Sequence, residues 1–410
     1  MSSRSADGVM RGSTWRSGPL TLRPVKRPKR GVINVAHVIT GLGMGGAENM
    51  LLKLLAHTDR HAFAAQVFTL GSASGPIVDQ IGELGFPVVS LGMEREAPSP
   101  RRVMELGRLL RQNPPDLVQT WMYHADLVGG LAAKIGRVRL PVVWNLRLSN
   151  PHRAFVRRRT LWLIRLCAAL SSRLPHTIIC CSAEAQRVHS ALGYQASKMR
   201  TIPNGFDVGR FRPNPEARAA LRAELGIPES AWIIGMVARF HPQKDHRSFI
   251  EAAAQLGKWR SDVHFVLCGP RIANETRELV GWIDSAGLRP AFHLLGPRPD
   301  VERVAAAFDV ASLSSVDEGF PNVVGEAMAC GVPCVATDVG ETARLVGDTG
   351  RIVPPGNPST LAQTWRELLE MGRPGLVALG ARARRRVEEH FSIGDAVHAY
   401  EGVYSEVVGR

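Results

Sequence analysis

The sequence predicts an α/β fold made of two doubly wound units, each with a parallel sheet between layers of helices. Three observations predict this class. Short apolar runs alternate with helical stretches along the chain, an order that is typical of parallel sheets. The length of 410 residues indicates two to three domains. A Pro-Asn-Gly-Phe-Asp turn at residues 203–207 separates two such series of runs.

Six strands are expected in each unit. In the first unit they are residues 33–40, 66–70, 87–91, 116–121, 141–147 and 176–182. In the second unit they are residues 232–240, 264–270, 291–296, 309–315, 333–337 and 351–353. The end of the chain is expected to be helical, because Val397, Tyr400, Tyr404 and Val407 recur at helical spacing. Sheets of this kind bind ligands beyond the carboxyl ends of their strands.

The overall composition is that of a soluble globular protein, with 45% hydrophobic and 21% charged residues. Six cysteines are scattered along the chain without the spacing of metal ligands. We therefore expect them to be reduced packing residues of a protein in a reducing, cytoplasmic compartment.

The net charge of +14 is unevenly distributed. Residues 1–30 contain eight Lys or Arg and one Asp, and so supply half of the net charge. This segment has no periodic apolar face, and it lacks the apolar core of a secretory signal. We expect a disordered basic tail. A transit peptide is the less favoured alternative.

A second basic region extends from Leu127 to Ala183, where ten Lys or Arg occur without any Asp or Glu. Within it, residues 155–170 are typical of an amphipathic helix. Arg158 and Arg165 share one side, flanked by Arg157 and Arg159, whereas Val156, Leu163, Cys167 and Leu170 lie on the other. Such a helix either packs on its own domain or places residues 153–173 against an anionic membrane surface. No stretch of the chain has the length of a membrane-spanning apolar segment.

Two carboxylates, Glu318 and Glu326, flank a Gly-Phe-Pro-Asn turn that follows the expected strand at residues 309–315. Pro321 suits the first position of a helix, where a missing N–H is harmless. Free N–H groups near Asn322 and Val323 would then form an anion site. Acids at this spacing also occur on solvated helices, so the hypothesis depends on the strand and the turn.

The first strand is followed by a glycine-rich loop. Gly41, Gly43 and Gly46 satisfy the G-x-G-x-x-G pattern of dinucleotide-binding proteins. The second strand, however, ends without the acid that this interpretation requires. Gly45 and Gly46 fit a different role, a tight turn whose amides approach a phosphate. A plain strand–helix turn is the simpler alternative.

Three further side chains follow expected strands. His124 comes just after residues 116–121, where it is well placed to touch a ligand, although a packing histidine is the commoner case. Arg239 ends the first strand of the second unit, and Lys244 follows five residues later. Together these cations could clamp a diphosphate and stabilise it as a leaving group. The alternative is that both are ordinary surface cations.

Taken together, these segments resemble the family-4 glycosyltransferases of the GT-B architecture. The resemblance covers about residues 33 to 408, and its most specific parts are Glu318–Glu326, Arg239 with Lys244, and the Gly41–Glu48 loop. It implies two Rossmann-like domains facing a cleft, with a C-terminal helix that crosses back to the first domain. The implied parts are an acceptor-side domain at 31–205, a nucleotide-sugar domain at 206–385 and the returning helix at 386–410.

The resemblance also implies roles for single residues. Glu326 would hold the ribose hydroxyls, and Glu318 would hold the transferred sugar. Arg239 and Lys244 would clamp the diphosphate, with His124 reaching the sugar from across the cleft. The donor site would further include Gly45, Gly46, Phe320, Asn322 and Val323.

The implied activity is that of a retaining glycosyltransferase. It would move a sugar from a nucleotide-diphosphate donor, with UDP expected first, to a glycan or lipid-linked acceptor in surface polysaccharide or glycolipid synthesis. The chain contains no Asp-x-Asp, so we expect no essential metal and no cofactor besides the donor. In this family a basic face of the N-terminal domain often meets membranes, and residues 153–173 could play that part.

Three alternatives remain open. A nucleotide-sugar epimerase or a glycan phosphorylase could use the same architecture. The net charge suggests a nucleic-acid-binding protein, but the basic residues lack interleaved aromatic residues and a known binding module, so no specific nucleic acid is expected. A dehydrogenase is suggested only by the glycine pattern of Gly41, Gly43 and Gly46.

Overall fold

The structure is a computed structural model that describes residues 31–43, 45–93, 99–135, 140–149, 151 and 156–410. The basic tail at 1–30, the start of the segment 153–173 and Phe155, the first residue of the helix expected at 155–170, lie outside the described residues.

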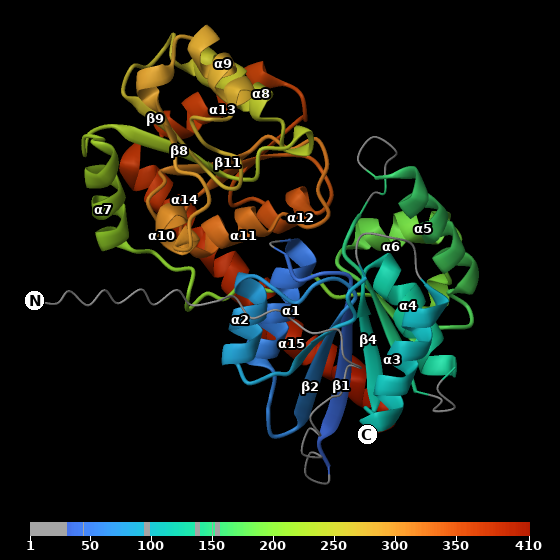
Figure 1. Cartoon of the computed structure of the whole chain (residues 1–410). Helices are drawn as coiled ribbons and strands as arrows, with labels where there is room; N and C mark the ends of the chain where they lie inside the picture. Colours follow the sequence, from blue (N-terminus) through green and yellow to red (C-terminus); the bar gives the residue numbers. More distant parts are fainter. Residues whose placement is uncertain (1–30, 44, 94–98, 136–139, 150, 152–155) are drawn as a thin grey trace, which may run out of the picture.

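The described chain forms two parallel sheets, each covered by helices on both faces (Figure 1). The first sheet has seven strands in the order β3-β2-β1-β4-β5-β6-β7, and the second has six in the order β10-β9-β8-β11-β12-β13. All neighbouring strands in both sheets are parallel. The predicted class, with two Rossmann-like units, is therefore confirmed.

The first unit runs from β1 to β7. Its elements are β1 (Ile33–Ile39), α1 (Gly46–His57), β2 (Phe63–Thr69), α2 (Pro76–Glu83), β3 (Val88–Ser90), α3 (Pro100–Gln112), β4 (Leu117–Trp121), α4 (Tyr123–Ile135), β5 (Val142–Leu146), α5 (Arg158–Leu170), β6 (Thr177–Cys180), α6 (Ala183–Ala191), η1 (Ala196–Lys198) and β7 (Met199–Thr201). Strand β7 was not predicted, because three residues with a central arginine show no strand pattern.

The second unit begins after the linker at residues 202–214. Its elements are α7 (Pro215–Leu225), β8 (Trp232–Val237), η2 (Pro242–Lys244), α8 (His246–Leu256), β9 (Val263–Cys268), α9 (Arg277–Ser285), η3 (Arg289–Ala291), β10 (Phe292–Leu294), α10 (Val301–Ala306), β11 (Val310–Leu313), α11 (Asn322–Ala329), β12 (Cys334–Thr337), α12 (Thr342–Val346), β13 (Arg351–Val353), α13 (Pro358–Glu370) and α14 (Gly372–His390). The last helix is α15 (Ile393–Val408).

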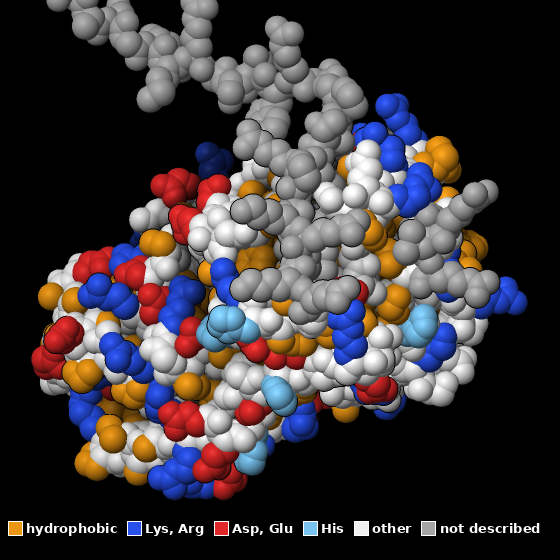
Figure 2. Space-filling view, turned by 90° about the horizontal axis from the view of Figure 1, so that it is seen from below, with side chains coloured by type: hydrophobic (Ala, Val, Ile, Leu, Met, Phe, Trp, Pro, Cys, Tyr) orange, Lys and Arg blue, Asp and Glu red, His pale blue; other side chains and the backbone are white. Residues whose placement is uncertain are grey.

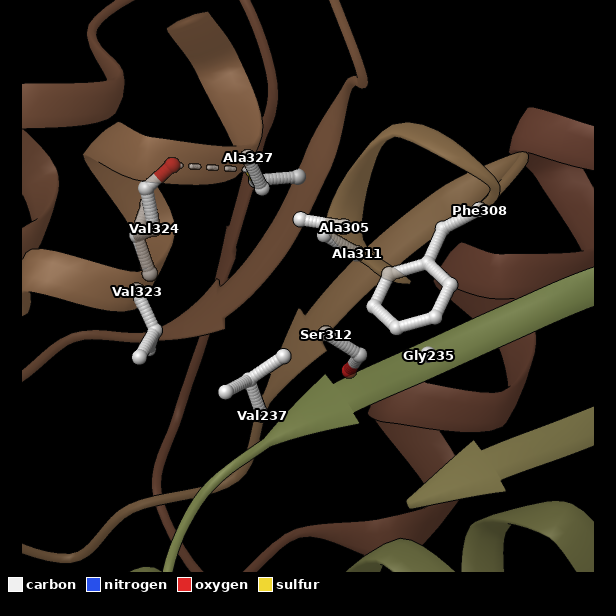
Figure 3. A pocket seen from close by; sticks show the side chains of 10 residues that line it. Gly235, Val237, Ala305, Phe308, Ala311, Ser312, Val323, Val324 and Ala327 are labelled. Carbon is white, nitrogen blue, oxygen red and sulfur yellow. Dashed lines mark hydrogen bonds between the residues drawn. The ribbon is translucent and has the colours of Figure 1, made fainter. Parts of the chain in front are cut away.

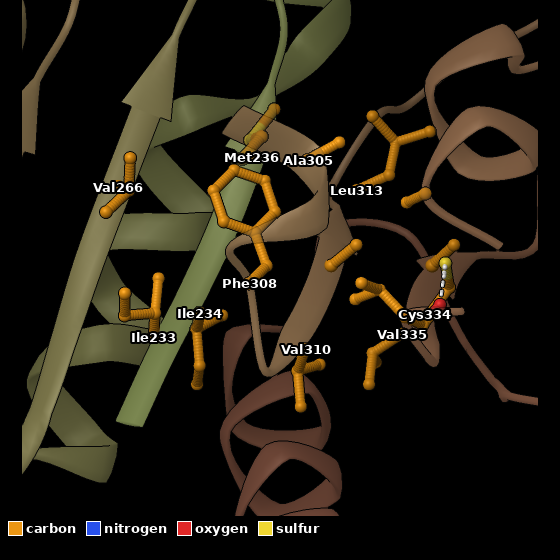
Figure 4. Packing of buried hydrophobic residues seen from close by; sticks show 14 of the residues in the cluster. Ile233, Ile234, Met236, Val266, Ala305, Phe308, Val310, Leu313, Cys334 and Val335 are labelled. Atoms are coloured by element: carbon orange, nitrogen blue, oxygen red, sulfur yellow. Dashed lines mark hydrogen bonds between the residues drawn. The ribbon is translucent and has the colours of Figure 1, made fainter. Parts of the chain in front are cut away.

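Each sheet has an apolar core. In the second unit, Phe308 packs beside Met236, Ile234 and Ala305, between β8 and α10 (Figure 4). Gly235 leaves room for this ring, since a Cβ there would lie 2.2 Å from it. All six cysteines are buried and unpaired, as expected of packing residues.

Helix α15 returns to the first unit and closes one face of its sheet. Val397, Tyr400 and Tyr404 pack with β1, α1 and α2 in one apolar cluster, which confirms the predicted returning helix. The two chain crossings between the units lie side by side. Phe206 N donates to Phe391 O at 2.9 Å, and Ile393 N donates to Phe206 O at 2.9 Å.

The linker also packs on α11. The Phe206 ring lies so close to Gly325 that a Cβ at this glycine would be 2.1 Å from the ring. Glycine at position 325 therefore sets the distance between α11 and the linker, and with it the placement of the segment from Glu318 to Glu326.

Replacing Gly325 by alanine should destabilise the protein by about 1–3 kcal/mol, because the new methyl group overpacks the Phe206 contact. Chemical denaturation of the purified protein measures the change. Gly281, within α9, is the matched control, since a Cβ there meets nothing within 4 Å. Its replacement by alanine should stabilise by up to about 1 kcal/mol through helix propensity. Equal stability of the Gly325 variant and the wild type would contradict the prediction.

Candidate active site

The predicted site residues gather at the switch points of the two sheets. In the first sheet the chain order reverses between the neighbours β1 and β4, and in the second between β8 and β11. The glycine loop follows β1, and His124 follows β4. Arg239 and Lys244 follow β8, and Glu318 follows β11. Because open α/β sheets bind ligands beyond the strands at this point, these residues form a candidate ligand site.

Glu318 is the most enclosed of these side chains, with 9% of its side chain exposed. Its Oε1 accepts from the Ser315 hydroxyl at 2.7 Å and forms an ion pair with Lys244 Nζ. From the sequence we expected Glu318 to hold the transferred sugar and Lys244 to hold the diphosphate. The structure places the two side chains in contact. Because both of these contacts use Oε1, Oε2 is the atom that can bind a ligand.

The loop of Glu318 is held between the two units. A Cβ at Gly319 would lie 3.2 Å from Arg147 O of the first unit. On the other side, a Cβ at Gly340 would lie 2.2 Å from Glu318 O, and this glycine has a φ of +55°. The glycines therefore allow three backbone segments to meet at Glu318.

Positive charge concentrates at the carboxyl end of β8. Arg239 is exposed, and its Nη2 donates to Gln243 Oε1 at 3.4 Å. Burial, followed by nearby Arg239, Lys244 and Arg271, lowers the pKa of His241. The sequence did not predict Arg271, which follows β9 at a φ of +63°. Three cations thus lie near His241, beyond the carboxyl end of β8.

Helix α11 begins beside this corner. It starts at Asn322, with Pro321 as its N-cap, so the predicted helix start was one residue too early. The Val324 and Gly325 amides bond to Pro321 O, which leaves the Asn322 and Val323 amides at the free helix start. The Phe320 ring is buried against Phe206, with ring centroids 6.1 Å apart, so this ring packs in the core.

Beneath α11, a cavity of about 10 Å³ separates the helix from the sheet (Figure 3). It is lined by Val323, Val324 and Ala327 on the helix side and by Gly235, Val237, Ala311 and Ser312 on the sheet side. Its size holds no more than one water molecule. The cavity beneath α11 is therefore too small for a nucleotide or a sugar.

Glu326 faces the first unit. Its Oε1 accepts from Lys53 Nζ at 3.0 Å, and Lys53 lies on α1. Both side chains are about one-sixth exposed, at 15% for Glu326 and 16% for Lys53. No sequence pattern marked Lys53, because the ion pair joins residues that are far apart in the chain.

The glycine loop begins α1 opposite α11. Gly45 is the N-cap of α1, and a Cβ there would lie 2.3 Å from Glu48 Oε2. Burial raises the pKa of Glu48, which the sequence had not singled out. A Cβ at Gly46 would lie 3.7 Å from Asn322 Nδ2. Of the two glycines that we predicted for phosphate binding, Gly46 therefore faces the start of α11, whereas Gly45 faces the Glu48 carboxylate.

His124 occupies the first turn of α4, just past β4. The turn is made by Met122, whose φ of +71° is unusual for a residue other than glycine. Burial lowers the pKa of His124, so the ring is neutral near pH 7 and can both donate and accept a hydrogen bond. Strained backbone of this kind is often retained at functional sites.

Two family models match the chain. The model for "Glycosyltransferase Family 4" matches residues 44–210, and that for "Glycosyl transferases group 1" matches residues 231–371. The chain belongs to the family-4 glycosyltransferases. The GT-B architecture follows from the two facing parallel sheets and from the solved structures described below.

Among relatives of this glycosyltransferase, the EpsF protein of Bacillus subtilis (strain 168), named as a glycosyltransferase, is 28% identical over 74% of this chain and 79% of its own. An Escherichia coli UDP-Gal:alpha-D-GlcNAc-diphosphoundecaprenol alpha-1,3-galactosyltransferase is 27% identical over 60% of this chain and 64% of its own. The crystal structure of Anabaena HepE with UDP-glucose has a TM-score of 0.78 at 24% identity, covering 91% of this chain and 100% of that one.

Proposed function

We propose that this glycosyltransferase retains anomeric configuration and transfers a hexosyl group from a UDP-sugar to a glycan or lipid-linked acceptor. The observation that carries the proposal is the meeting of Glu318 and Lys244 between the cations of β8 and the free start of α11. One carboxylate oxygen is left for a sugar hydroxyl, and positive groups lie beside it for a diphosphate. The acceptor would enter from the first unit, between the glycine loop and His124.

In the proposed reaction the acceptor hydroxyl oxygen bonds to the anomeric carbon on the face from which the diphosphate departs. The bond from that carbon to the phosphate oxygen breaks, and the hydroxyl proton passes to the departing phosphate. Glu318 then positions the sugar and does not form a covalent bond to it. Catalysis rests on positioning and on stabilising the charge of the leaving group.

The protein's own groups supply that stabilisation. Arg239, Lys244 and Arg271 all lie near His241, and α11 begins four residues after Glu318, the partner of Lys244. We propose that these cations take the place that a metal ion has in other diphosphate sites, so that neither a metal nor a further cofactor is needed.

The UDP donor is favoured by the relatives. The Escherichia coli relative is named for UDP-Gal, and HepE was solved with UDP and with UDP-glucose. The name of the Escherichia coli relative also includes a diphosphoundecaprenol acceptor, which supports a lipid-linked acceptor here. On this proposal the enzyme works in surface polysaccharide or glycolipid synthesis at the cytoplasmic side of a membrane.

A donor screen tests the proposal. UDP-, GDP- and ADP-sugars are compared for thermal stabilisation and for slow hydrolysis without acceptor. A UDP-sugar should stabilise most and release UDP. A rapid epimer, or a sugar phosphate formed from a glycan and inorganic phosphate, would favour the epimerase or the phosphorylase. Absence of binding by all three nucleotides would overturn the proposed function.

The face shown in Figure 2 does not favour a nucleic-acid surface. On much of it, blue Lys and Arg side chains are mixed with red acidic ones, and only a small group of blue side chains lies together at the upper right. Nucleic-acid-binding proteins instead gather their cations into a patch or stripe. Charge of the kind seen here supports at most weak, salt-sensitive binding.

We further propose that helix α5 rests on an anionic membrane. Its exposed side carries Trp162 and Leu166, which are 71% and 47% exposed, between exposed arginines at 158, 159 and 165. Arg165 lies 5.7 Å from the centroid of the Trp162 ring. The opposite side packs Leu163 and Cys167 into the domain. One side of α5 therefore packs on its own domain. The other side supports the membrane proposal, because exposed aromatic and basic side chains are typical of interfacial helices.

Within the described ranges, no helix combines the length and apolar character needed to cross a bilayer. An attachment through α5 would thus be a surface contact. Replacing Arg157, Arg158 and Arg159 by glutamate should reduce binding to liposomes that contain anionic lipids by about tenfold or more, since each cation contributes about 1 kcal/mol. Sedimentation with liposomes measures the change.

Trp162→Ser should also weaken liposome binding, whereas Trp259→Ser should not. Trp259 is the matched control, because it is 47% exposed and carries an arginine, Arg366, at 5.2 Å from its ring, but lies in the second unit. Unchanged liposome binding by the charge-reversal variant would remove the membrane proposal and leave the transferase proposal intact.

A further inference from the structure

A series of hydrogen-bonded polar side chains joins the two units at the start of α11. It begins at Arg147, at the carboxyl end of β5, continues to Asn204 in the linker and ends at Asn322, the first residue of α11. Arg147 Nη2 donates to Asn204 Oδ1, and Asn204 Nδ2 donates to Asn322 Oδ1 at 2.6 Å. Asn204 is 4% exposed, so water does not compete for these contacts.

The direction of this chain follows from the chemistry of its first member. A guanidinium group has donors only, so the Asn204 atom that faces Arg147 must be the amide oxygen. The Asn204 nitrogen must then face Asn322, which in turn must present its own oxygen. The Asn322 amide nitrogen therefore points away from Asn204. This nitrogen lies 3.7 Å from the place that a Cβ on Gly46 would occupy. A second N–H donor is thereby aimed at the space between α11 and the glycine loop.

Arg147 is itself fixed. Its Nη1 donates to the Tyr400 hydroxyl at 3.3 Å, and the same hydroxyl accepts from Asn145 Nδ2 at 2.9 Å. The guanidinium also lies 5.9 Å from the centroid of the Trp121 ring. Tyr400 is fully buried on the returning helix α15. The orientation of Arg147 therefore depends on the core of the first unit and not on the ligand.

We propose that Arg147 and Asn204 are positioning residues which hold the Asn322 amide with its N–H groups toward the diphosphate of the donor. Asn322 then adds a side-chain donor to the backbone donors at the start of α11. The inference rests on the proposed function, because it assumes that a nucleoside diphosphate binds here. By this inference Asn204 of the linker and Arg147 of the first unit both contribute to binding a ligand that the second unit holds.

The test is Asn204→Asp, which changes polarity and hardly changes shape. The carboxylate still pairs with Arg147, but its second oxygen now faces Asn322. The Asn322 amide must turn its nitrogen to this oxygen, and its own oxygen then faces the diphosphate. Isothermal titration of UDP should show a dissociation constant raised about tenfold to hundredfold, the range for a lost hydrogen bond to a charged group. Uridine, which lacks phosphates, should bind the variant and the wild type equally.

Two controls separate positioning from a merely structural effect. Asn274→Asp makes the same change in an exposed pair, where Arg289 Nη2 donates to Asn274 Oδ1 at 2.8 Å, and should leave UDP affinity unchanged. In an Asn322→Ala background, Asn204→Asp should cause no further loss of UDP affinity, because the residue through which it acts is gone. If Asn204→Asp does not fold, Asn204→Ala should show the same loss in smaller measure.

The outcomes are distinct. Wild-type UDP affinity in the Asn204 variants would overturn the inference, as would an equal loss for UDP and uridine or a loss that persists in the Asn322→Ala background. A wild-type protein that binds no nucleoside diphosphate would instead overturn the proposed function.

Discussion

Lys244→Ala should lower kcat for release of UDP from the donor by about 100- to 1000-fold, and the variant should still fold. Lys244 is paired with Glu318 and lies in the group of cations that includes Arg239 and Arg271. Negative charge grows on the diphosphate as the bond to the sugar breaks, so a fixed cation contributes more in the transition state than in the bound ground state. Removing one such group costs about 3–4 kcal/mol of transition-state stabilisation in comparable sites.

The same substitution leaves Glu318 without its cationic partner, although Ser315 still donates to Oε1. The transferred sugar should then be held less firmly, which adds to the loss in kcat. Lys258→Ala is the control, because Lys258 is exposed and lies in the same unit at the end of α8. The measurement is initial rates of UDP release over a range of donor concentrations. Wild-type turnover by the Lys244 variant would refute the assignment of this site.

Much of the fold could be predicted because local patterns determine it. Apolar runs marked every strand except β7, and the turn at 203–207 marked the linker. The helix at residues 155–170 was expected three residues earlier than its observed start at Arg158, and residues 152–155 lie outside the described chain. Its packed side was predicted correctly, because Leu163 and Cys167 follow helical spacing. Its exposed Trp162 and Leu166 were not noticed, since apolar residues are normally assigned to the core.

The candidate site was only partly predictable. The segments that carry Gly46, His124, Lys244 and Glu318 could be located, because each follows a strand that is evident in the sequence. What local patterns cannot show is which strands lie side by side, and hence that these loops meet at two switch points. The ion pair of Lys53 with Glu326 and the chain from Arg147 to Asn322 depend on how the two units face one another. Neither has a signal in either unit alone.

Replacing Glu326 should have the second large effect, and this effect should be seen in the affinity for the nucleotide as well as in turnover. If this carboxylate holds the ribose, the wild type should bind UDP about tenfold or more tightly than 2′-deoxy-UDP, because a hydrogen bond to a charged group contributes about 1.5–3 kcal/mol. Lys53 donates to Glu326 Oε1 at 3.0 Å and so orients the carboxylate, which leaves Oε2 for a hydroxyl. Glu326→Ala should bind both nucleotides with the same, weaker affinity.

The loss of discrimination is the decisive readout, since a general disturbance of α11 would weaken both ligands and keep their ratio. Lys53→Ala should reduce the preference for UDP over 2′-deoxy-UDP without abolishing it. The Glu326 carboxylate remains in this variant but is no longer held by a residue of the first unit. In the Glu326→Ala background, Lys53→Ala should have no further effect on either affinity. Retention of the wild-type ratio by Glu326→Ala would show that the ribose is held elsewhere. The pair of Glu318 and Glu326 would then have to be reinterpreted, with only Glu318 in contact with the donor.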